Sequence, residues 1–163
     1  MKVIYKELSL IIAGMVIVYF VPIISYKLSF PFYYFEPMRW FVMLAIAHSL
    51  KRSAYSIAII LPIFSFLIAN HPSLAKTVLL SGDLLLNTFL FFYLIKIISN
   101  KFFAMCISIT VSKIAYYLLK LISIELSIID GGLISTPLHY QAAIVILLSA
   151  YVYFLDKVKM IKN

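Results

Sequence analysis

Residues 74–98 read LAKTVLLSGDLLLNTFLFFYLIKII, and this stretch decides the fold. Its lysines lie toward its two ends, and Asp83 is the one charge in its interior. At 1.5 Å per residue a helix of this length measures about 37 Å, which exceeds the roughly 30 Å hydrocarbon thickness of a bilayer. The stretch therefore predicts a transmembrane helix that carries a carboxylate inside the membrane.

Five more apolar blocks accompany this stretch. They cover residues 8–26, 38–50, 53–69, 102–124 and 137–155. The chain is 64% hydrophobic and 12% charged, whereas soluble domains are about 45–50% apolar and about 25% charged. We therefore predict an all-α integral membrane protein in which residues 1–163 form one bundle of six transmembrane helices, surrounded by membrane lipid. A turn is expected at residues 70–73, NHPS.

Basic residues are unevenly divided between the segments that join these blocks. With the N-terminus inside, the cytoplasmic segments hold Lys2, Lys6, Lys51, Arg52, Lys96, Lys101, Lys157, Lys159 and Lys162. The outer segments hold Lys27, Arg39 and Lys76, with Lys120 near that edge. The positive-inside rule therefore predicts a multi-pass protein of the inner (plasma) membrane with both termini in the cytoplasm. The same rule accounts for the net charge of +8 without a nucleic-acid partner.

No motif in the sequence indicates catalysis or a cofactor. The sequence has no HExxH, no GxSxG and no Asp-rich phosphate motif. Its three histidines fall at different depths, and its single cysteine, Cys106, excludes an internal disulfide and a cysteine-based metal site. We expect neither enzyme activity nor a bound metal or cofactor.

Asp83 and Lys113 are the two charges in the interiors of the six blocks, and ionisable groups inside a bilayer are usually functional. Each lies about 15 Å from the outer end of its helix, and the two helices are consecutive and antiparallel. A direct Asp83–Lys113 pair is therefore possible. It could be a structural ion pair or part of a solute site, and the two readings are equally favoured. Asn87 follows Asp83 by four residues and shares its helix face, and Tyr116 lies beside Lys113.

Further polar and aromatic residues are expected at the outer side of the bundle. Arg39 and Trp40 begin the block 38–50, where an interfacial anchor is favoured over a binding role. Tyr117 and Lys120 are likewise typical anchors, whereas His139 could reach an outward-facing pocket or cap its helix. The connector 27–37, KLSFPFYYFEP, contains two prolines and is expected to lie at the membrane interface or to fold back over the bundle. Its aromatic residues Phe32, Tyr33 and Tyr34, together with Trp40, would then close over a ligand.

The layout resembles the substrate-binding (S) component of energy-coupling factor (ECF) transporters. The resemblance is strongest in FEPMRWFVMLAIAHSLKRSAYSIAIILPIFSFLIANHP (residues 35–72) and SLAKTVLLSGDLLLNTFLFFYL (residues 73–94). It implies a six-helix protein that captures a vitamin or similar micronutrient from outside, under a first loop that caps the pocket.

The resemblance also implies where the pocket lies and which partners the protein needs. The pocket would lie between the connector 27–37 and the outer halves of the last three helices. Asp83, Asn87, Lys113, Tyr116 and His139 fall there. Transport would need a coupling transmembrane subunit and ATPases, because the chain has no Walker-type phosphate loop.

The alternative family is the rod-shape-determining (MreD-like) membrane scaffold, which has a similar length and layout. Such a protein would bind other membrane proteins and transport no solute. The glycine-rich, acidic segment expected near the third and fourth helices of that family is missing, since the chain has four glycines in all.

Overall fold

The computed structural model describes residues 2–69 and 72–161, and it contains no strand in these ranges. The elements are α1 (Lys2–Leu28), the 3-10 turn η1 (Phe32–Phe35), α2 (Pro37–His48), α3 (Lys51–Ala69), α4 (Leu74–Leu94), α5 (Lys101–Glu125) and α6 (Leu138–Ile161). The all-α prediction is confirmed. Of the predicted turn at 70–73, residues 70 and 71 lie outside the described residues.

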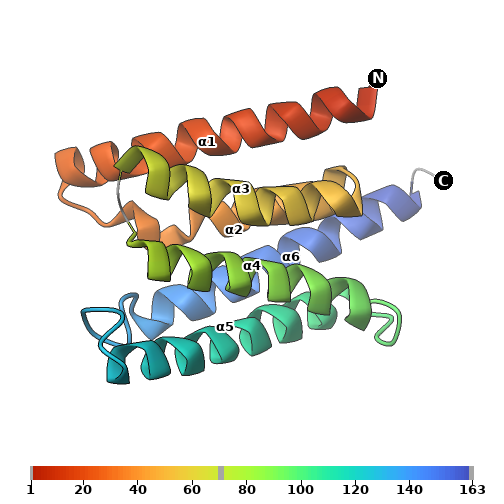
Figure 1. The fold of residues 1–163 in the computed structure, drawn as a ribbon. Helices are drawn as coiled ribbons and strands as arrows, with labels where there is room; N and C mark the ends of the chain where they lie inside the picture. Colours follow the sequence, from red (N-terminus) through yellow and green to blue (C-terminus); the bar gives the residue numbers. More distant parts are fainter. Residues whose placement is uncertain (1, 70–71, 162–163) are drawn as a thin grey trace.

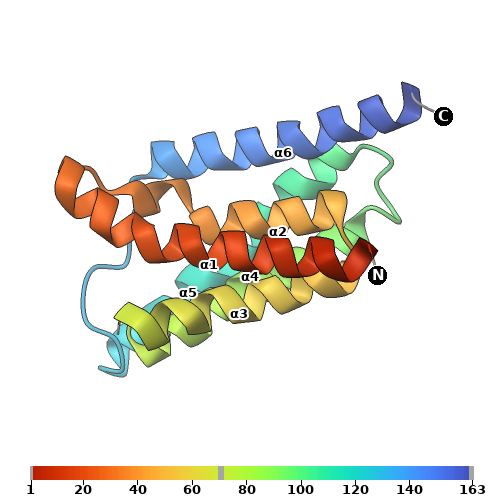
Figure 2. The ribbon, with the colours of Figure 1, turned by 90° about the horizontal axis from the view of Figure 1, so that it is seen from above.

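The helices run alternately up and down along a common direction. Figures 1 and 2 show the first turn of α1 and the last turn of α6 at the same end of the bundle. The connectors 29–36 and 126–137 lie together at the opposite end, which we call the connector end. Consecutive helices pack side by side, with α3 against α4, α4 against α5 and α5 against α6.

Within the described residues, five helices are long and apolar enough to cross a membrane, which makes the chain a multi-pass membrane helix bundle. These helices contain the candidate spans Tyr5–Leu28, Lys51–Ile68, Leu74–Leu94, Lys101–Glu125 and Leu138–Leu155. Helix α2 has 12 residues, or about 18 Å of helix, against a hydrocarbon core of about 30 Å. The structure therefore contains the sixth helix but does not show it as a full span.

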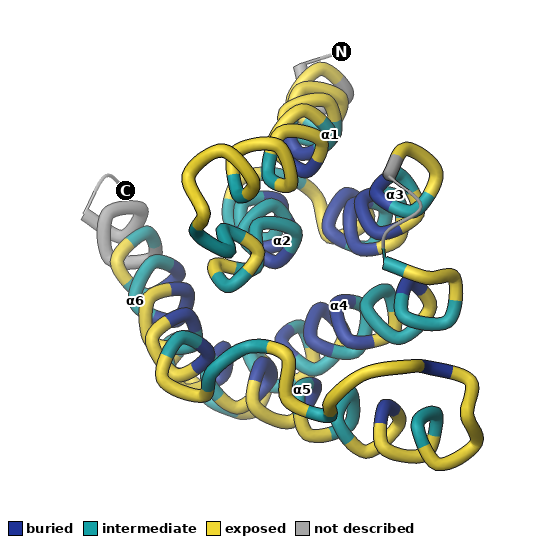
Figure 3. Tube along the Cα trace, turned by 90° about the vertical axis from the view of Figure 1, so that its left-hand side faces the viewer, coloured by how far each residue is buried: buried dark blue, intermediate teal, exposed yellow. Residues whose placement is uncertain are grey.

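The short helix α2 lies in the middle of the bundle. It packs against α1, α3, α4 and α6, and Figure 3 shows it enclosed by its neighbours when the molecule is viewed from the connector end. Val42, Met43 and Ala45 have no exposed surface. Because α2 is enclosed, any polar side chain that points inward from it is removed from lipid and water.

Gly14 marks the closest approach of α1 to its neighbours. A Cβ atom at this position would lie 3.0 Å from both methyl groups of Leu61 and 3.2 Å from the ring of Phe41. Small residues at helix contacts allow this kind of close packing in membranes. By contrast, a Cβ at Gly82 on α4 would meet no atom within 4 Å.

We expect Gly14→Leu to destabilise the protein by about 1–3 kcal/mol, because the added side chain overpacks the α1–α3 contact. The midpoint of thermal unfolding in detergent measures this effect. Gly82→Leu is the matched control and should be neutral or slightly stabilising, because leucine favours a helix more than glycine does. Equal midpoints for the two variants would show that the contact is not tight.

Candidate functional site

Arg39 joins three other polar side chains in the interior of the bundle. Its Nε donates to Glu36 Oε2 at 2.6 Å, its Nη1 donates to Asn87 Oδ1 at 3.3 Å, and its Nη2 pairs with Asp83 Oδ2. The residue is 2% exposed. The favoured interpretation of Arg39 as an interfacial anchor is therefore wrong, because the first turn of α2 directs the guanidinium inward toward α4.

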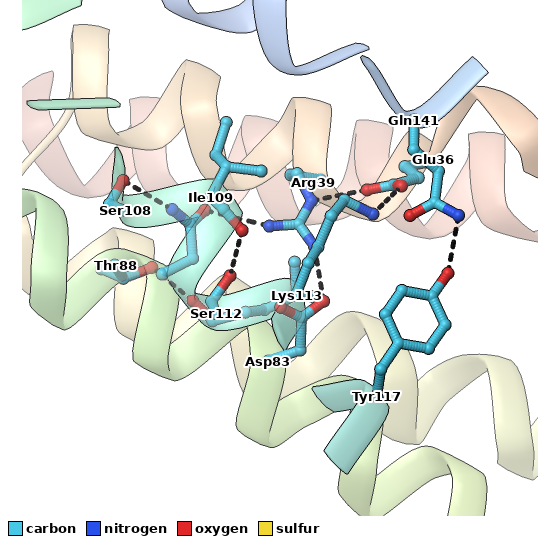
Figure 4. A network of polar contacts seen from close by, with 12 residues as sticks. Glu36, Arg39, Asp83, Thr88, Ser108, Ile109, Ser112, Lys113, Tyr117 and Gln141 are labelled. Atoms are coloured by element: carbon cyan, nitrogen blue, oxygen red, sulfur yellow. Dashed lines mark hydrogen bonds and ion pairs between the residues drawn. The ribbon is translucent and has the colours of Figure 1, made fainter. Parts of the chain in front are cut away.

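Lys113 on α5 completes the site by donating to Glu36 Oε1. The charges alternate along the path Asp83–Arg39–Glu36–Lys113, and they sum to zero. Asp83 and Lys113, whose direct pairing the sequence allowed, are each held here by another partner. Figure 4 shows these side chains converging from the connector, α2, α4 and α5. We call Glu36, Arg39, Asp83, Lys113 and Asn87 the charge cluster.

Asn87 anchors the charge cluster to α5. It has no exposed surface, and its Nδ2 donates to Ser108 Oγ at 2.9 Å. Ser108 in turn donates to the carbonyl oxygen of Met105, also at 2.9 Å. Asp83 and Asn87 both bond Arg39, which confirms the prediction that they share one face of their helix.

One carboxylate oxygen of the charge cluster is not satisfied. Asp83 is 7% exposed, and its Oδ1 has no hydrogen-bond partner within the described part of the chain. A buried acceptor without a partner costs roughly 1–3 kcal/mol, so native proteins keep few of them. This oxygen is an acceptor that the fold leaves open.

Glu36 sits in the connector that precedes α2. Its backbone adopts the left-handed conformation (φ 50°, ψ 57°), and its carbonyl oxygen accepts from the amide of Arg39 at 2.9 Å. The carboxylate therefore lies at the N-terminus of α2, where the helix dipole favours negative charge. Burial by itself raises the pKa of Glu36, but the charges of Arg39 and Lys113 outweigh burial, and the net direction is down. Its ion pairs are therefore complete above the ordinary pKa of a glutamate and are lost only as the pH falls below that range.

Glu36 was not among the residues singled out in the sequence. It lies between Phe35 and Pro37 in an aromatic connector, where nothing in the sequence indicates that the carboxylate turns toward Arg39 and Lys113. The proline offers a partial signal, because proline at the first position of a helix makes the preceding residue its N-cap.

The aromatic residues of the connector pack on the start of α6. The rings of Tyr34 and Tyr140 lie 5.3 Å apart, and those of Phe35 and Tyr140 lie 6.3 Å apart. His139 is exposed and lies 4.5 Å from the Tyr140 ring. The predicted residues Tyr34 and His139 are therefore neighbours through Tyr140, and of the two predicted paths the connector takes the one that folds back onto the bundle.

The other predicted residues make their contacts with aromatic side chains of α5 and α6. Tyr116 is partly buried on α5, with its ring 5.3 Å from that of Tyr117. The Tyr117 hydroxyl accepts from Gln141 Nε2 at 2.6 Å, which ties α5 to α6. Trp40 packs edge-on to Tyr151, 6.4 Å away between ring centroids. Trp40 thus contacts the second half of α6, away from the aromatic residues of the connector.

Lys120 is a second buried cation, outside the charge cluster. It is 2% exposed, and its Nζ donates to the carbonyl oxygen of Leu133 and to Ser135 Oγ, each at 2.7 Å. The prediction of an interfacial anchor at Lys120 is wrong, because the connector 126–137 folds over the side chain and supplies its acceptors.

Two hollows among the described residues lie away from the charge cluster. One lies between α1 and α3 and is lined by Pro22 and Ser65. The other lies between α2, α4 and α6 and is lined by Ile46, Phe91 and Val152. Among the described residues no group of three histidine, cysteine, aspartate or glutamate side chains is placed to hold a metal ion.

The arrangement can offer two cations to an anionic or carbonyl group, and a carboxylate and an amide to a hydrogen-bond donor. The chain has no match among protein-family models, curated proteins or solved structures.

Proposed function

We propose that this protein is a membrane-embedded binding protein for a small, partly polar solute, with the charge cluster as its binding site. The observation that carries the proposal is the burial of Arg39, Asp83 and Asn87 inside an apolar bundle, with the charges of Glu36 and Lys113 partly buried beside them. Taking a charge out of water costs several kcal/mol, and well-packed apolar residues often serve stability equally well. Stability alone is therefore a weak reason to keep the cluster, and function is the stronger one.

The residues of the site have distinct roles in this proposal. Lys113 and Arg39 meet an acidic or carbonyl group of the solute. Asp83 contributes an acceptor, and Asn87 contributes a donor or an acceptor. Tyr34 belongs to the aromatic connector that covers the site from the connector end.

Three more residues complete the proposed site at its edges. Tyr116 lies one turn of helix from Lys113 and would extend the site along α5. His139 would act near the entrance beside the connector, and Trp40 would close the site toward α6.

In its more specific form the proposal is the substrate-binding component of an ECF-type transporter for a micronutrient or vitamin. Helix α2 would then be the sixth, shortened crossing. Both termini would lie in the cytoplasm, and the connector end would face outward from the plasma membrane. The resemblance of residues 35–94 and the position of the first turn of α1 and the last turn of α6 at one end of the bundle support this form. A coupling transmembrane subunit and ATPases would be its partners.

A second candidate is an MreD-like scaffold that binds other membrane proteins. The observation that favours it is the internal pairing of all four charges of the cluster, which leaves none of them without a partner inside the protein. In that case the charge cluster would only hold α2, α4 and α5 together, and no solute would be involved.

Native mass spectrometry of the protein purified from its own membranes separates the two functions. For a binding protein we expect a co-purifying small molecule that is lost from Asp83→Ala and Lys113→Ala. Arg52→Ala is the control, because Arg52 is exposed at the opposite end of the bundle and should leave the solute bound. Repeated isolation without any small molecule, but with cell-wall proteins attached, would contradict binding and favour the scaffold. Co-purified ATPases would support the ECF form.

A further inference from the structure

Glu36 differs from the other members of the charge cluster because it belongs to a connector. Arg39, Asp83, Asn87 and Lys113 are fixed on helices, whereas Glu36 lies between η1 and α2. Its two oxygens accept from two separate cations, Oε2 from Arg39 and Oε1 from Lys113. Arg39 and Lys113 thus form a pair of cations on two helices, which we call the cationic cradle. The connector supplies the anion between them, the Glu36 carboxylate.

The connector is held in place by few buried contacts. None of the residues of η1 is buried. Apart from the Glu36 ion pairs, the segment is fixed by ring contacts and by two hydrogen bonds to Ser25, from the Phe30 amide to its carbonyl oxygen at 3.2 Å and from the Phe32 amide to its Oγ at 3.1 Å. Ser29 and Glu36, at its two ends, both have φ of 50°. Residues other than glycine adopt this backbone only where their surroundings enforce it. The connector can therefore leave its place with little loss of buried packing and with relief of backbone strain.

We propose that the Glu36 carboxylate occupies the place of a solute carboxylate, and that a carboxylate-bearing solute binds by displacing Glu36 from Arg39 and Lys113. This inference rests on the proposed function and names its solute class. The exchange replaces one carboxylate by another, so the net charge inside the bundle stays at zero. The displaced connector moves away from the bundle, and Glu36 moves toward water at the connector end.

A solute carboxylate fits this cradle better than an uncharged group does. Charge-assisted hydrogen bonds to a carboxylate are roughly twice as strong as neutral ones, and a neutral amide would leave one positive charge uncompensated. Asp83 cannot replace Glu36, because it pairs with Arg39 and its single negative charge can balance only one of the two cations. An empty cradle therefore selects a carboxylate from solution.

Chemical rescue tests this inference on the purified protein in detergent. Glu36→Ala is expected to lower the melting temperature by about 10 °C, because two cations lose their shared partner. Propionate should restore at least half of that loss, whereas propionamide and an equal concentration of chloride should restore none. Glu36→Ala combined with Lys113→Met should lose the response to propionate. Glu125→Ala removes an exposed carboxylate at the end of α5. It should change neither the melting temperature nor its response to propionate.

Glu36→Gln keeps the inference testable if Glu36→Ala does not fold. Glutamine has the same shape but no charge, so propionate should displace it more readily and raise the melting temperature more than it does in the wild type. Equal responses to propionate and propionamide in the folded variants would overturn the inference.

The native mass spectrometry experiment distinguishes failure of this inference from failure of the proposed function. A co-purified solute that lacks a carboxylate would overturn this inference and leave the proposed function standing. Rescue by propionate in a protein that never carries a solute would support the cationic cradle as a carboxylate site and would count against the proposed function.

Discussion

Replacing Arg39 by methionine is expected to lower the free energy of unfolding by about 3–5 kcal/mol, because it breaks a buried ion-pair chain from one side. Asp83 would keep a negative charge inside the bundle with no cation bonded to it. Glu36 would retain Lys113 alone, and the Asn87 carbonyl would lose its donor. Methionine fills a similar volume, so the loss reports charge and hydrogen bonds more than packing.

Unfolding of the purified protein in mixed micelles measures this effect. Arg52→Met is the matched control, because Arg52 is exposed and its replacement should change stability by no more than about 0.5 kcal/mol. Equal stability of Arg39→Met and the wild type would show that the guanidinium is not buried as the structure places it.

Removing Asp83 together with Arg39 is expected to reverse most of this loss. The double variant Arg39→Met/Asp83→Leu takes away one positive and one negative charge, so Glu36 and Lys113 remain as a neutral pair. Apolar replacements of buried ion pairs are often neutral or stabilising, and we expect the double variant to lie within about 1–2 kcal/mol of the wild type. It should be more stable than either Arg39→Met or Asp83→Leu.

A double-mutant cycle on these variants isolates the Arg39–Asp83 term. Strictly additive losses would contradict the account, because residues that share a buried ion pair must couple. Asn87 is left without Arg39 in every variant that lacks the guanidinium, so its contribution cancels between Arg39→Met and the double variant.

Much of the fold follows from the sequence because the membrane simplifies the physical problem. A bilayer requires long apolar helices whose backbone groups bond internally, and the blocks around Asp83 and Lys113 meet this requirement visibly. Helix α2 shows that an apolar block in the sequence does not by itself establish a membrane-spanning helix. Pro37 begins it and Ser49 caps its end, which matches the predicted block 38–50 closely, yet the resulting helix is too short to span on its own.

The charge cluster could be predicted only in part. Asp83, Asn87 and Lys113 stand out because they are polar inside apolar helices. Arg39 and Glu36 lie at the edge of a block, where charges are usually solvated, and position along the chain does not reveal that α2 is enclosed. Counting residues from the helix ends placed Asp83 and Lys113 at the same depth in the membrane. It did not show that Arg39 and Glu36 connect them.

Lys120 illustrates the same limit. A lysine near the end of a membrane helix usually extends toward the interface, so its spacing with Tyr117 indicates an anchor. The acceptors that bury it instead come from Leu133 and Ser135, in a connector whose path depends on tertiary structure.

The most direct test of the central claim, that the charge cluster serves binding more than stability, is native mass spectrometry of the Arg39→Met/Asp83→Leu variant. We predict a folded protein with near wild-type stability that has lost the small molecule carried by the wild type. A variant that still carries this molecule, or a wild-type protein that never carries one, would contradict the account.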